Sequence, residues 1–392
     1  MRVSKTVVIT CVLLLGASSA FAGFYQPGHV TYTALGTPSS SYTYAFAVSN
    51  PGLTGGPVVS GEAVFSGQAK SQAFAWQNGT FNALPRIGTD LTKGGASGLD
   101  ISGDGSVVVG RDVNWNAVRW EAGAGLDWTN PTTINMGNLE GKALSYVTPN
   151  SNFYSRANAI SADGTVIVGN SKNATYDSGL QAISYAGSAG PMVGLNPATV
   201  TVNDALGISD NGAFIVGQGN SKTQAFILNV ATNTGVYLPG TGKAMDVTDD
   251  GTVAVGVDGS SVACKWTYAG GTWTQTTLSN TWGQGSIVHR ISASGDLLYG
   301  GMKHPNGNYA PTLWGPSDIT GTLLVSILSA EGISFMSATD ATNVTAGMSP
   351  DGTTICGSNY TKTDAWIVTL PEPASLLLLG LGGLFLRRRR AC

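Results

Sequence analysis

The sequence predicts an all-β fold, a β-propeller of seven four-stranded blades, and three observations lead to this prediction. A unit like residues 157–169, ANAISADGTVIVG, recurs seven times along the 392 residues. Each unit contains two short runs rich in β-branched residues around an Asp-Gly pair, which is a strong β-hairpin signal. Charged residues make up only 11% of the chain while glycine reaches 54 residues, as expected for strands joined by tight turns. Such repeats bury apolar surface between neighbouring units.

The strands of each copy can be placed in order. Around the hairpin of residues 159–168 we expect a third strand at 181–185 and a fourth at 144–147. In the first and most distorted copy, strands are expected at 31–35, 45–49 and 58–61, with 72–76 as its outer strand. The later hairpins are expected within 96–110, 205–217, 244–256, 291–300 and 347–357, and their third strands within 116–120, 224–227, 263–266, 312–314 and 364–367.

A glycine that ends the second run of every hairpin measures the length of the repeat. Successive glycines lie 39 to 59 residues apart, at positions 61, 110, 169, 217, 256, 300 and 357. This is about the length of a four-stranded propeller blade, so seven copies predict seven blades. The count shifts by one if the distorted first copy supplies strands to the last blade, a common way to close a propeller ring.

The N-terminus has the three parts of a secretory signal peptide. A short basic segment at residues 1–5 precedes an apolar run at 6–15, and Ala20 and Ala22 supply the small residues of a cleavage site after Ala22. We therefore expect an N-terminal signal helix in residues 1–22 and a mature chain that begins at residue 23.

The C-terminus combines Pro371, Glu372 and Pro373 with an apolar run at 376–386 and four arginines, Arg387, Arg388, Arg389 and Arg390. The apolar run predicts a short hydrophobic helix that enters a membrane, and the arginines would keep the C-terminus on the cytoplasmic side. This end, residues 371–392, resembles the PEP-CTERM sorting signal of Gram-negative bacteria. The resemblance implies transient anchoring in the inner membrane, processing by an exosortase-type membrane peptidase, and transfer to the envelope surface or release from the cell.

The body between these ends, residues 23–370, resembles the HAF family of extracellular repeats. That family's Ala-x-x-Ile-Ser-x-Asp-Gly-x-Val-x-Val-Gly core is matched by residues 157–169, and its Ala-Phe-x-Trp ending by residues 73–76. The resemblance implies a secreted propeller. The histidine that usually precedes Ala-Phe is replaced by Gln72, Gln181 and Gln224, so no role of that histidine can be transferred to this chain.

Charge and motifs exclude several classes of function. Removing six of the 20 basic and one of the 23 acidic residues with the predicted leader and tail leaves a net charge of about −8. Such an acidic body argues against nucleic acid as a partner. The sequence also lacks a nucleophile elbow, a zinc-protease motif and a phosphate-binding glycine loop, and it has only three histidines. No catalytic or cofactor-binding residue is therefore assigned.

Two sets of residues are weak candidates for ligand contacts. Aspartates in the hairpin turns suggest calcium, but an Asp-Gly turn needs no metal, so turn formation is the preferred interpretation for Asp104, Asp163, Asp210, Asp250 and Asp351. Tryptophans that end the third strands are expected to pack between blades: Trp76, Trp120, Trp266, Trp314 and Trp366. Four tryptophans do not end a third strand. They are expected in loops or at edges and are the better candidates for contact with a glycan: Trp115, Trp128, Trp273 and Trp282.

The sequence thus predicts a secreted or surface-displayed protein without enzymatic activity. Its expected role is a structural or binding component of the bacterial envelope or biofilm matrix, with exopolysaccharide or another surface protein as partner. The alternative is an extracellular carbohydrate-active enzyme, a glycoside hydrolase or polysaccharide lyase, that uses carboxylates from loops at one mouth of the ring.

Overall fold

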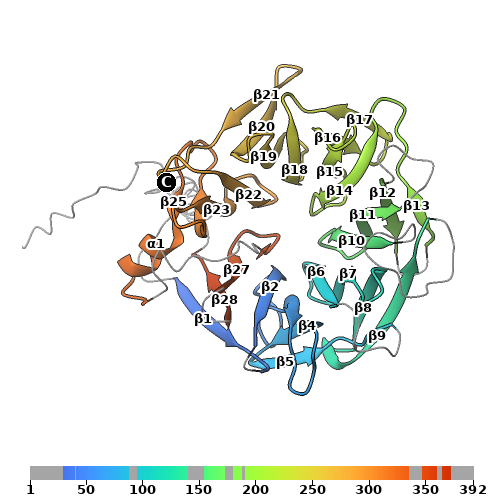
Figure 1. Cartoon of the computed structure of the whole chain (residues 1–392), viewed down its shortest axis with the longest axis vertical. Helices are drawn as coiled ribbons and strands as arrows, with labels where there is room; N and C mark the ends of the chain where they lie inside the picture. The colour runs from blue at the N-terminus through green and yellow to red at the C-terminus, as the bar shows by residue number, and fades with distance from the viewer. Residues whose placement is uncertain are drawn as a thin grey trace, which may run out of the picture.

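The computed structural model describes residues 30–39, 41–87, 95–139, 154–172, 180–187, 190–334, 347–359 and 364–371. These residues form seven four-stranded antiparallel sheets arranged in a ring, so the predicted seven-bladed propeller is confirmed (Figure 1). The described part of the chain contains one helix, α1 (Leu324–Ala330), beside blade six. The helices expected in the leader and in the tail lie outside the described residues.

The strands of blades one to four follow one another along the chain, from the innermost to the outermost strand of each sheet. Blade one contains β2 (Thr43–Val48), β3 (Val59–Ala63), β4 (Gln72–Gln77) and β5 (Thr80–Ala83). Blade two contains β6 (Ser97–Ile101), β7 (Val107–Arg111), β8 (Ala117–Gly123) and β9 (Asp127–Gly137). Blade three contains β10 (Ser155–Ile160), β11 (Val166–Lys172), β12 (Leu180–Ala186) and β13 (Met192–Gly194). Blade four contains β14 (Val202–Ile208), β15 (Phe214–Gly219), β16 (Gln224–Asn229) and β17 (Thr234–Tyr237).

Blades five and six repeat this order, and blade seven closes the ring. Blade five contains β18 (Gly242–Val247), β19 (Val253–Asp258), β20 (Ala263–Ala269) and β21 (Thr272–Thr277). Blade six contains β22 (Ser286–Ile291), β23 (Leu298–Lys303), β24 (Tyr309–Trp314) and β25 (Thr322–Leu323). Blade seven contains β26 (Gly347–Met348), β27 (Thr354–Asn359) and β28 (Asp364–Thr369), and its fourth strand is β1 (Thr31–Gly36).

The ring closes by pairing the first strand of the chain with the last. β1 runs antiparallel to β28, with Thr31 opposite Thr369 and Thr33 opposite Ile367. The strand predicted at 31–35 therefore exists but belongs to blade seven, while blade one is completed by β5. The blade count remains seven because one strand is given to the last blade and one is gained in the first.

The outermost strands are the hardest to predict from the sequence. The segment 72–76 was predicted as the outer strand of the first copy, but β4 is the third strand and β5 covers it. In blade three the fourth strand is β13, which follows the third strand, and the fourth strand predicted at 144–147 lies outside the described residues. The outer strands β5 and β13 have only four and three residues, none of them buried, so they lack the apolar pattern that marks the inner strands.

The predicted blade-ending tryptophans do pack between blades. Trp120, Trp266 and Trp314 are completely buried, and Trp76 and Trp366 are at most 5% exposed. The indole nitrogen of Trp120 donates to the carbonyl of Pro85 at 2.8 Å, and that of Trp266 donates to Pro239 at the same distance. Cys264 and Cys356 are buried free thiols.

The glycine that recurs in the second strand has a steric origin. The innermost strand carries a β-bulge in blade three, between Ala157 and Ala159, and its backbone approaches the second strand there. A Cβ at Gly169 would collide with the carbonyl oxygen of Arg156, and one at Gly110 would collide with that of Ser97. Only glycine fits at this close approach.

Antiparallel pairing puts the connections of every blade at two opposite ends of the ring. We call the end that holds the turns between first and second strands the turn face, and the end where the chain enters each innermost strand the connection face. At the turn face a ring of hydrogen bonds joins each blade to the next: Asn50 N to Gly103 O, Gly103 N to Ala162 O, Ala162 N to Asp210 O, Asn211 N to Asp249 Oδ1, Asp249 N to Ala293 O, Ala293 N to Pro350 O and Asp351 N to Asn50 Oδ1. The hairpin turns thus fasten the blades together as well as reversing the chain.

Candidate functional site

The candidate site is a charged cluster where the innermost strands face the ring axis. One position of the repeat lies directly before the apolar residue that ends each innermost strand and the Ser or Thr that follows it. This position is occupied by Asp100, Asp246 and Arg290 in blades two, five and six. In the other four blades the same position holds a small residue: Ala47, Ala159, Gly207 and Gly347. The small side chains leave room for the charged ones.

A β-bulge directs this position toward the axis. The pairing between the first and second strands shifts register immediately before Asp100, Asp246 and Arg290. Bulges commonly redirect a side chain in this way. All three residues line one cavity on the axis, together with Asp210 from the turn after β14.

Arg290 reaches across the axis to a distant blade. Its Nη2 lies 3.1 Å from Oδ1 of Asp100, which connects blade six to blade two. The two side chains are only 16% and 12% exposed. Burial alone would lower the pKa of Arg290, but the nearby carboxylates of Asp100 and Asp246 outweigh it and raise that pKa, so the guanidinium stays charged.

The aspartates are also bound to the backbone of the next blade. Oδ2 of Asp100 accepts the amide of Ile160 in blade three at 3.0 Å. Oδ2 of Asp246 accepts the amide of Ile291 in blade six at 3.0 Å, and its Oδ1 accepts the amide of Val247 at 2.9 Å. Each carboxylate therefore links two adjacent blades through a hydrogen bond.

Burial makes these carboxyl groups hold protons at unusually high pH. Burial together with the carboxylates of Asp246 and Asp249 raises the pKa of Asp210 to about 8. Burial raises the pKa of Asp246 to about 7, and it raises the pKa of Asp100 although Arg290 acts in the opposite direction. Near neutral pH the cluster therefore contains exchangeable protons as well as charges.

The cavity is small. Its volume is about 30 Å³, enough for one or two water molecules, whereas small-molecule sites usually occupy about 300 Å³ or more. Among the described residues no group of three or more His, Cys, Asp or Glu side chains is arranged to hold a metal ion. The cluster can bind water and move protons, but a sugar ring does not fit into this cavity.

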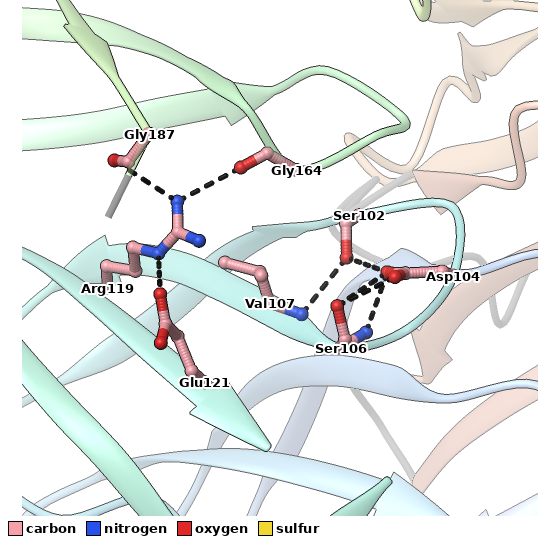
Figure 2. A network of polar contacts seen from close by, with 8 residues as sticks. All are labelled: Ser102, Asp104, Ser106, Val107, Arg119, Glu121, Gly164 and Gly187. Atoms are coloured by element: carbon pink, nitrogen blue, oxygen red, sulfur yellow. Dashed lines mark hydrogen bonds and ion pairs between the residues drawn. The ribbon is translucent and has the colours of Figure 1, made fainter. Parts of the chain in front are cut away.

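The aspartates at the tips of the hairpins are explained by the turns themselves (Figure 2). Oδ1 of Asp104 accepts the Ser102 hydroxyl at 2.6 Å, the Ser106 amide at 3.0 Å and the Ser106 hydroxyl at 2.8 Å. Asp163, Asp250 and Asp351 make the same set of bonds with their own Ser and Thr neighbours. The preferred interpretation of these residues as turn formers agrees with this geometry.

The prediction that Asp210 forms a hairpin turn is wrong. In blade four the turn position is occupied by Asn211, whose Oδ1 accepts the Ser209 hydroxyl and the Ala213 amide. Asp210 precedes it and lines the axial cavity. Two adjacent polar residues before the glycine made the sequence alignment ambiguous by one position.

Figure 2 also shows a second contact between blades at the turn face. Arg119 of β8 donates to the carbonyl of Gly164 in the turn of blade three at 3.0 Å, and its Nε lies 2.6 Å from Oε1 of Glu121. This arginine is 7% exposed. It stabilises the junction between blades two and three.

The four tryptophans proposed for glycan contact lie in different environments. Trp128 in β9 is 2% exposed and packs in the apolar core between blades one and two, so its side chain is not available on the surface. Trp273 in β21 lies beside Tyr268 with ring centroids 5.3 Å apart, and Trp282 lies beside His304 at 4.8 Å. Trp115 lies under the guanidinium of Arg111, 4.2 Å from the ring centroid. These last three are partly exposed.

The charged axial residues were missed in the sequence, although a signal was present. Asp100, Asp246 and Arg290 interrupt a repeat position that is otherwise Ala or Gly. The structure does not test the predicted ends of the chain. Ala20 and Ala22 of the predicted cleavage site, and Glu372, Pro373 and Arg387–Arg390 of the tail, lie outside the described residues, while Pro371 is the last described residue. Within the described residues no helix is long and apolar enough to span a membrane.

Comparison with known proteins supports the fold. No family model matches this chain, and no curated protein matches it. Among solved structures, an oligogalacturonate lyase in complex with manganese is 12% identical with a TM-score of 0.52, over 89% of this chain and 96% of the other. A chain of the mitotic checkpoint complex is 14% identical with a TM-score of 0.51, over the same shares of the two chains. Because proteins of unrelated activities share the architecture at such low identity, these neighbours show the propeller fold and leave the activity open.

Proposed function

We propose that this chain is an exported, non-enzymatic propeller that serves as a structural or binding component of a bacterial envelope or its exopolysaccharide matrix. The observation that carries the proposal is that the axial carboxylates are engaged in bonds within the ring. Asp100 and Asp246 are bound to backbone amides of neighbouring blades, and Asp100 is also paired with Arg290, so these groups serve to hold the ring together. The surrounding cavity of about 30 Å³ is too small for a sugar.

Export and sorting rest on the two ends of the sequence. The basic and apolar leader before Ala22 supports secretion, and the Pro-Glu-Pro motif with its apolar run and arginines supports recognition by an exosortase-type peptidase in a Gram-negative cell. The protein would be anchored in the inner membrane as a precursor and then reach the envelope surface or the medium. A repeat body with turns made by its own side chains suits this extracellular role.

The sorting part of the proposal can be tested by fractionation. Deletion of residues 371–392, and replacement of the four arginines by serine in a separate variant, should change the compartment in which the protein accumulates. A matched control replaces an exposed lysine of the body, Lys222. If the deletion variant distributes like the unchanged protein, the sorting proposal is wrong.

A carbohydrate-active enzyme is the second candidate, and one observation favours it. Asp210 and Asp246 hold protons near neutral pH, as a general acid must. The test is a screen of the exported protein against neutral and acidic polysaccharides, with detection of new reducing ends and of unsaturated products. We expect no turnover; turnover that disappears in Asp210→Asn and Asp246→Asn would replace the first proposal by the second.

A further inference from the structure

The two faces of the ring carry opposite kinds of charge. In the described chain, aspartates dominate the turn face, including Asp104, Asp163, Asp249, Asp250, Asp296 and Asp351. Basic residues at strand ends or turns of the connection face come from blades two to six: Arg111, Arg156, Lys172, Lys222, Lys243 and Lys303. Carboxylates partly offset them there, namely Glu62, Asp112, Asp204, Asp258 and Asp364. An anionic partner would therefore approach the connection face, although the body as a whole is acidic.

Positive charge and aromatic rings come together where blades two and three meet on this face. The guanidinium of Arg111 lies 4.2 Å from the centroid of the Trp115 ring. The ring of Tyr154 meets Trp115 edge-on at 6.4 Å between centroids, and Nζ of Lys172 lies 6.0 Å from the Tyr154 ring. All four side chains are partly exposed. We call these four residues the Trp115 cluster.

The cations of the cluster have nearby charges of both signs. Burial lowers the pKa of Arg111, the carboxylates of Glu62 and Asp112 act in the opposite direction, and the guanidinium of Arg156 lowers it further. Among the described residues no carboxylate forms a salt bridge with Arg111, Arg156 or Lys172. The neighbouring Asp112 is buried, with its Oδ1 bound to the amides of Asn114 and Asn116.

Folding does not require tryptophan at position 115. The turn between β7 and β8 has the amide of Asp112 bonded to the carbonyl of Asn116 and the amide of Trp115 bonded to the carbonyl of Asp112. The same pair of bonds forms around Asp258 in blade five and around His304 in blade six, and there the residue in the position of Trp115 is Ser261 or Gly307.

All three positions have positive φ, and Trp115 has φ of +61°. A bulky side chain is unfavourable in this left-handed conformation, where glycine costs least. The backbone carbonyl of Trp115 accepts the amide of Ser155 at 2.9 Å, a bond that any residue would preserve. Residues held in unfavourable backbone regions tend to cluster at functional sites. Here the Trp115 side chain places an aromatic ring in the same cluster as the cations of Arg111 and Lys172.

This combination fits one class of ligand. A sugar ring offers apolar C–H faces that stack on an indole, and a uronate sugar adds a carboxylate that a guanidinium and an ammonium can bind. Neutral glycans would leave the two cations unused. Resting on the proposed function above, we propose that the Trp115 cluster is a binding site for an acidic, carboxylated polysaccharide.

The experiment measures binding of the full chain, in mild detergent, to immobilised alginate. Its propylene glycol ester, in which many carboxylates are neutralised, serves as the matched polysaccharide control. We expect binding to alginate that weakens with added salt, and at least about tenfold weaker binding to the ester. Equal binding to both polymers, or none to alginate, overturns the proposal.

Trp115→Gly separates a binding role from a folding role. Glycine suits the backbone at this position, so we expect the melting temperature to stay the same or rise while affinity for alginate falls about tenfold. Lys172→Ala, outside the strained turn, should weaken binding by a smaller factor. The control is Trp273→Ala, which removes a comparable aromatic pair from the turn-face edge of blade five and should leave affinity unchanged.

Four further results would contradict the site. Trp115→Gly could unfold the chain, which would make the tryptophan structural, or it could bind alginate as before. Binding lost equally in Trp273→Ala would place the ligand elsewhere. The chain could instead self-associate at low salt through its oppositely charged faces without competition by alginate. The basic connection face would then bind a second copy of the chain. Turnover of alginate would refute the non-enzymatic function while leaving the binding site intact.

Discussion

Two sets of aspartates near the turn face have opposite properties. Asp163 and Asp250, at the tips of hairpins, are reached by solvent and accept bonds from neighbouring Ser and Thr residues. Partial burial would raise their pKa values, but these hydrogen bonds outweigh it and hold the pKa below its usual range. Asp210 and Asp246, which line the axial cavity, have pKa values raised to about 8 and about 7.

The comparison shows how one residue type takes two roles in a repeat protein. The hairpin aspartates follow the repeat and are satisfied within their own turn, so each blade can form its turn independently. The axial charges depart from the repeat, and each of them has a partner in another blade, as with Arg290 of blade six and Asp100 of blade two. Departures from the repeat are therefore where interactions specific to the closed ring are found.

The largest expected effect comes from removing the axial cation. Arg290→Met leaves Asp100 and Asp246 mostly buried without a positive partner, so we expect the free energy of unfolding to fall by about 3 kcal/mol at pH 8. At pH 5 the loss should be smaller because the carboxyl groups take up protons. Denaturant unfolding at both pH values measures this. The double variant Arg290→Met with Asp100→Asn should recover part of the loss, and an equal loss at both pH values would contradict the role of the carboxylates.

A smaller effect is expected in the pH dependence of stability. A carboxyl whose pKa is raised on folding binds more protons in the folded state, so stability falls as pH rises from about 4 to about 7. We expect the unfolding free energy to drop by on the order of 1–3 kcal/mol between pH 5 and pH 8, and Asp246→Asn to flatten this slope. A stability that rises over this interval in the unchanged protein would show that other groups dominate.

The hairpin aspartates should respond in the opposite direction and more weakly. Asp163→Ala removes the acceptor of three hydrogen-bond donors in one turn, and we expect a loss of about 1 kcal/mol at neutral pH. Because the pKa of Asp163 is lowered, this contribution is present above the ordinary carboxyl pKa and is lost as pH falls below it. Asp163→Asn is the control, since Asn211 already fills the equivalent position in blade four and accepts the corresponding Ser hydroxyl and backbone amide there. Equal losses in both variants would contradict this account.

The smallest effect is expected from calcium. Oxygen atoms of the hairpin aspartates are already engaged by hydroxyl and amide donors, so they are poorly arranged as metal ligands. Melting temperatures in calcium and in a chelator should agree within about 1 °C, whereas one kcal/mol of stabilisation would shift the melting temperature by several degrees at most. A rise of several degrees in calcium would restore the calcium hypothesis.

The inner strands could be predicted because their pattern is local. Two β-branched runs around Asp-Gly define each hairpin, as in residues 157–169, and the glycine that ends it is imposed by contact within one blade. The outer strands β5 and β13 were missed because exposed strands of three or four residues have no apolar alternation to recognise. The partner of β1 could not be chosen from sequence because its pairing with β28 joins opposite ends of the chain.

By itself, the sequence determined the all-β repeat architecture, the number of blades and the position of every hairpin, because each blade's pattern is set by neighbours close in the chain. It also identified the tryptophans that pack between blades. Only the tertiary structure decided the identity of the axial cluster. Arg290 and Asp100 are 190 residues apart and meet only when the ring closes. Their importance comes from burial beside each other, a property that no local pattern encodes.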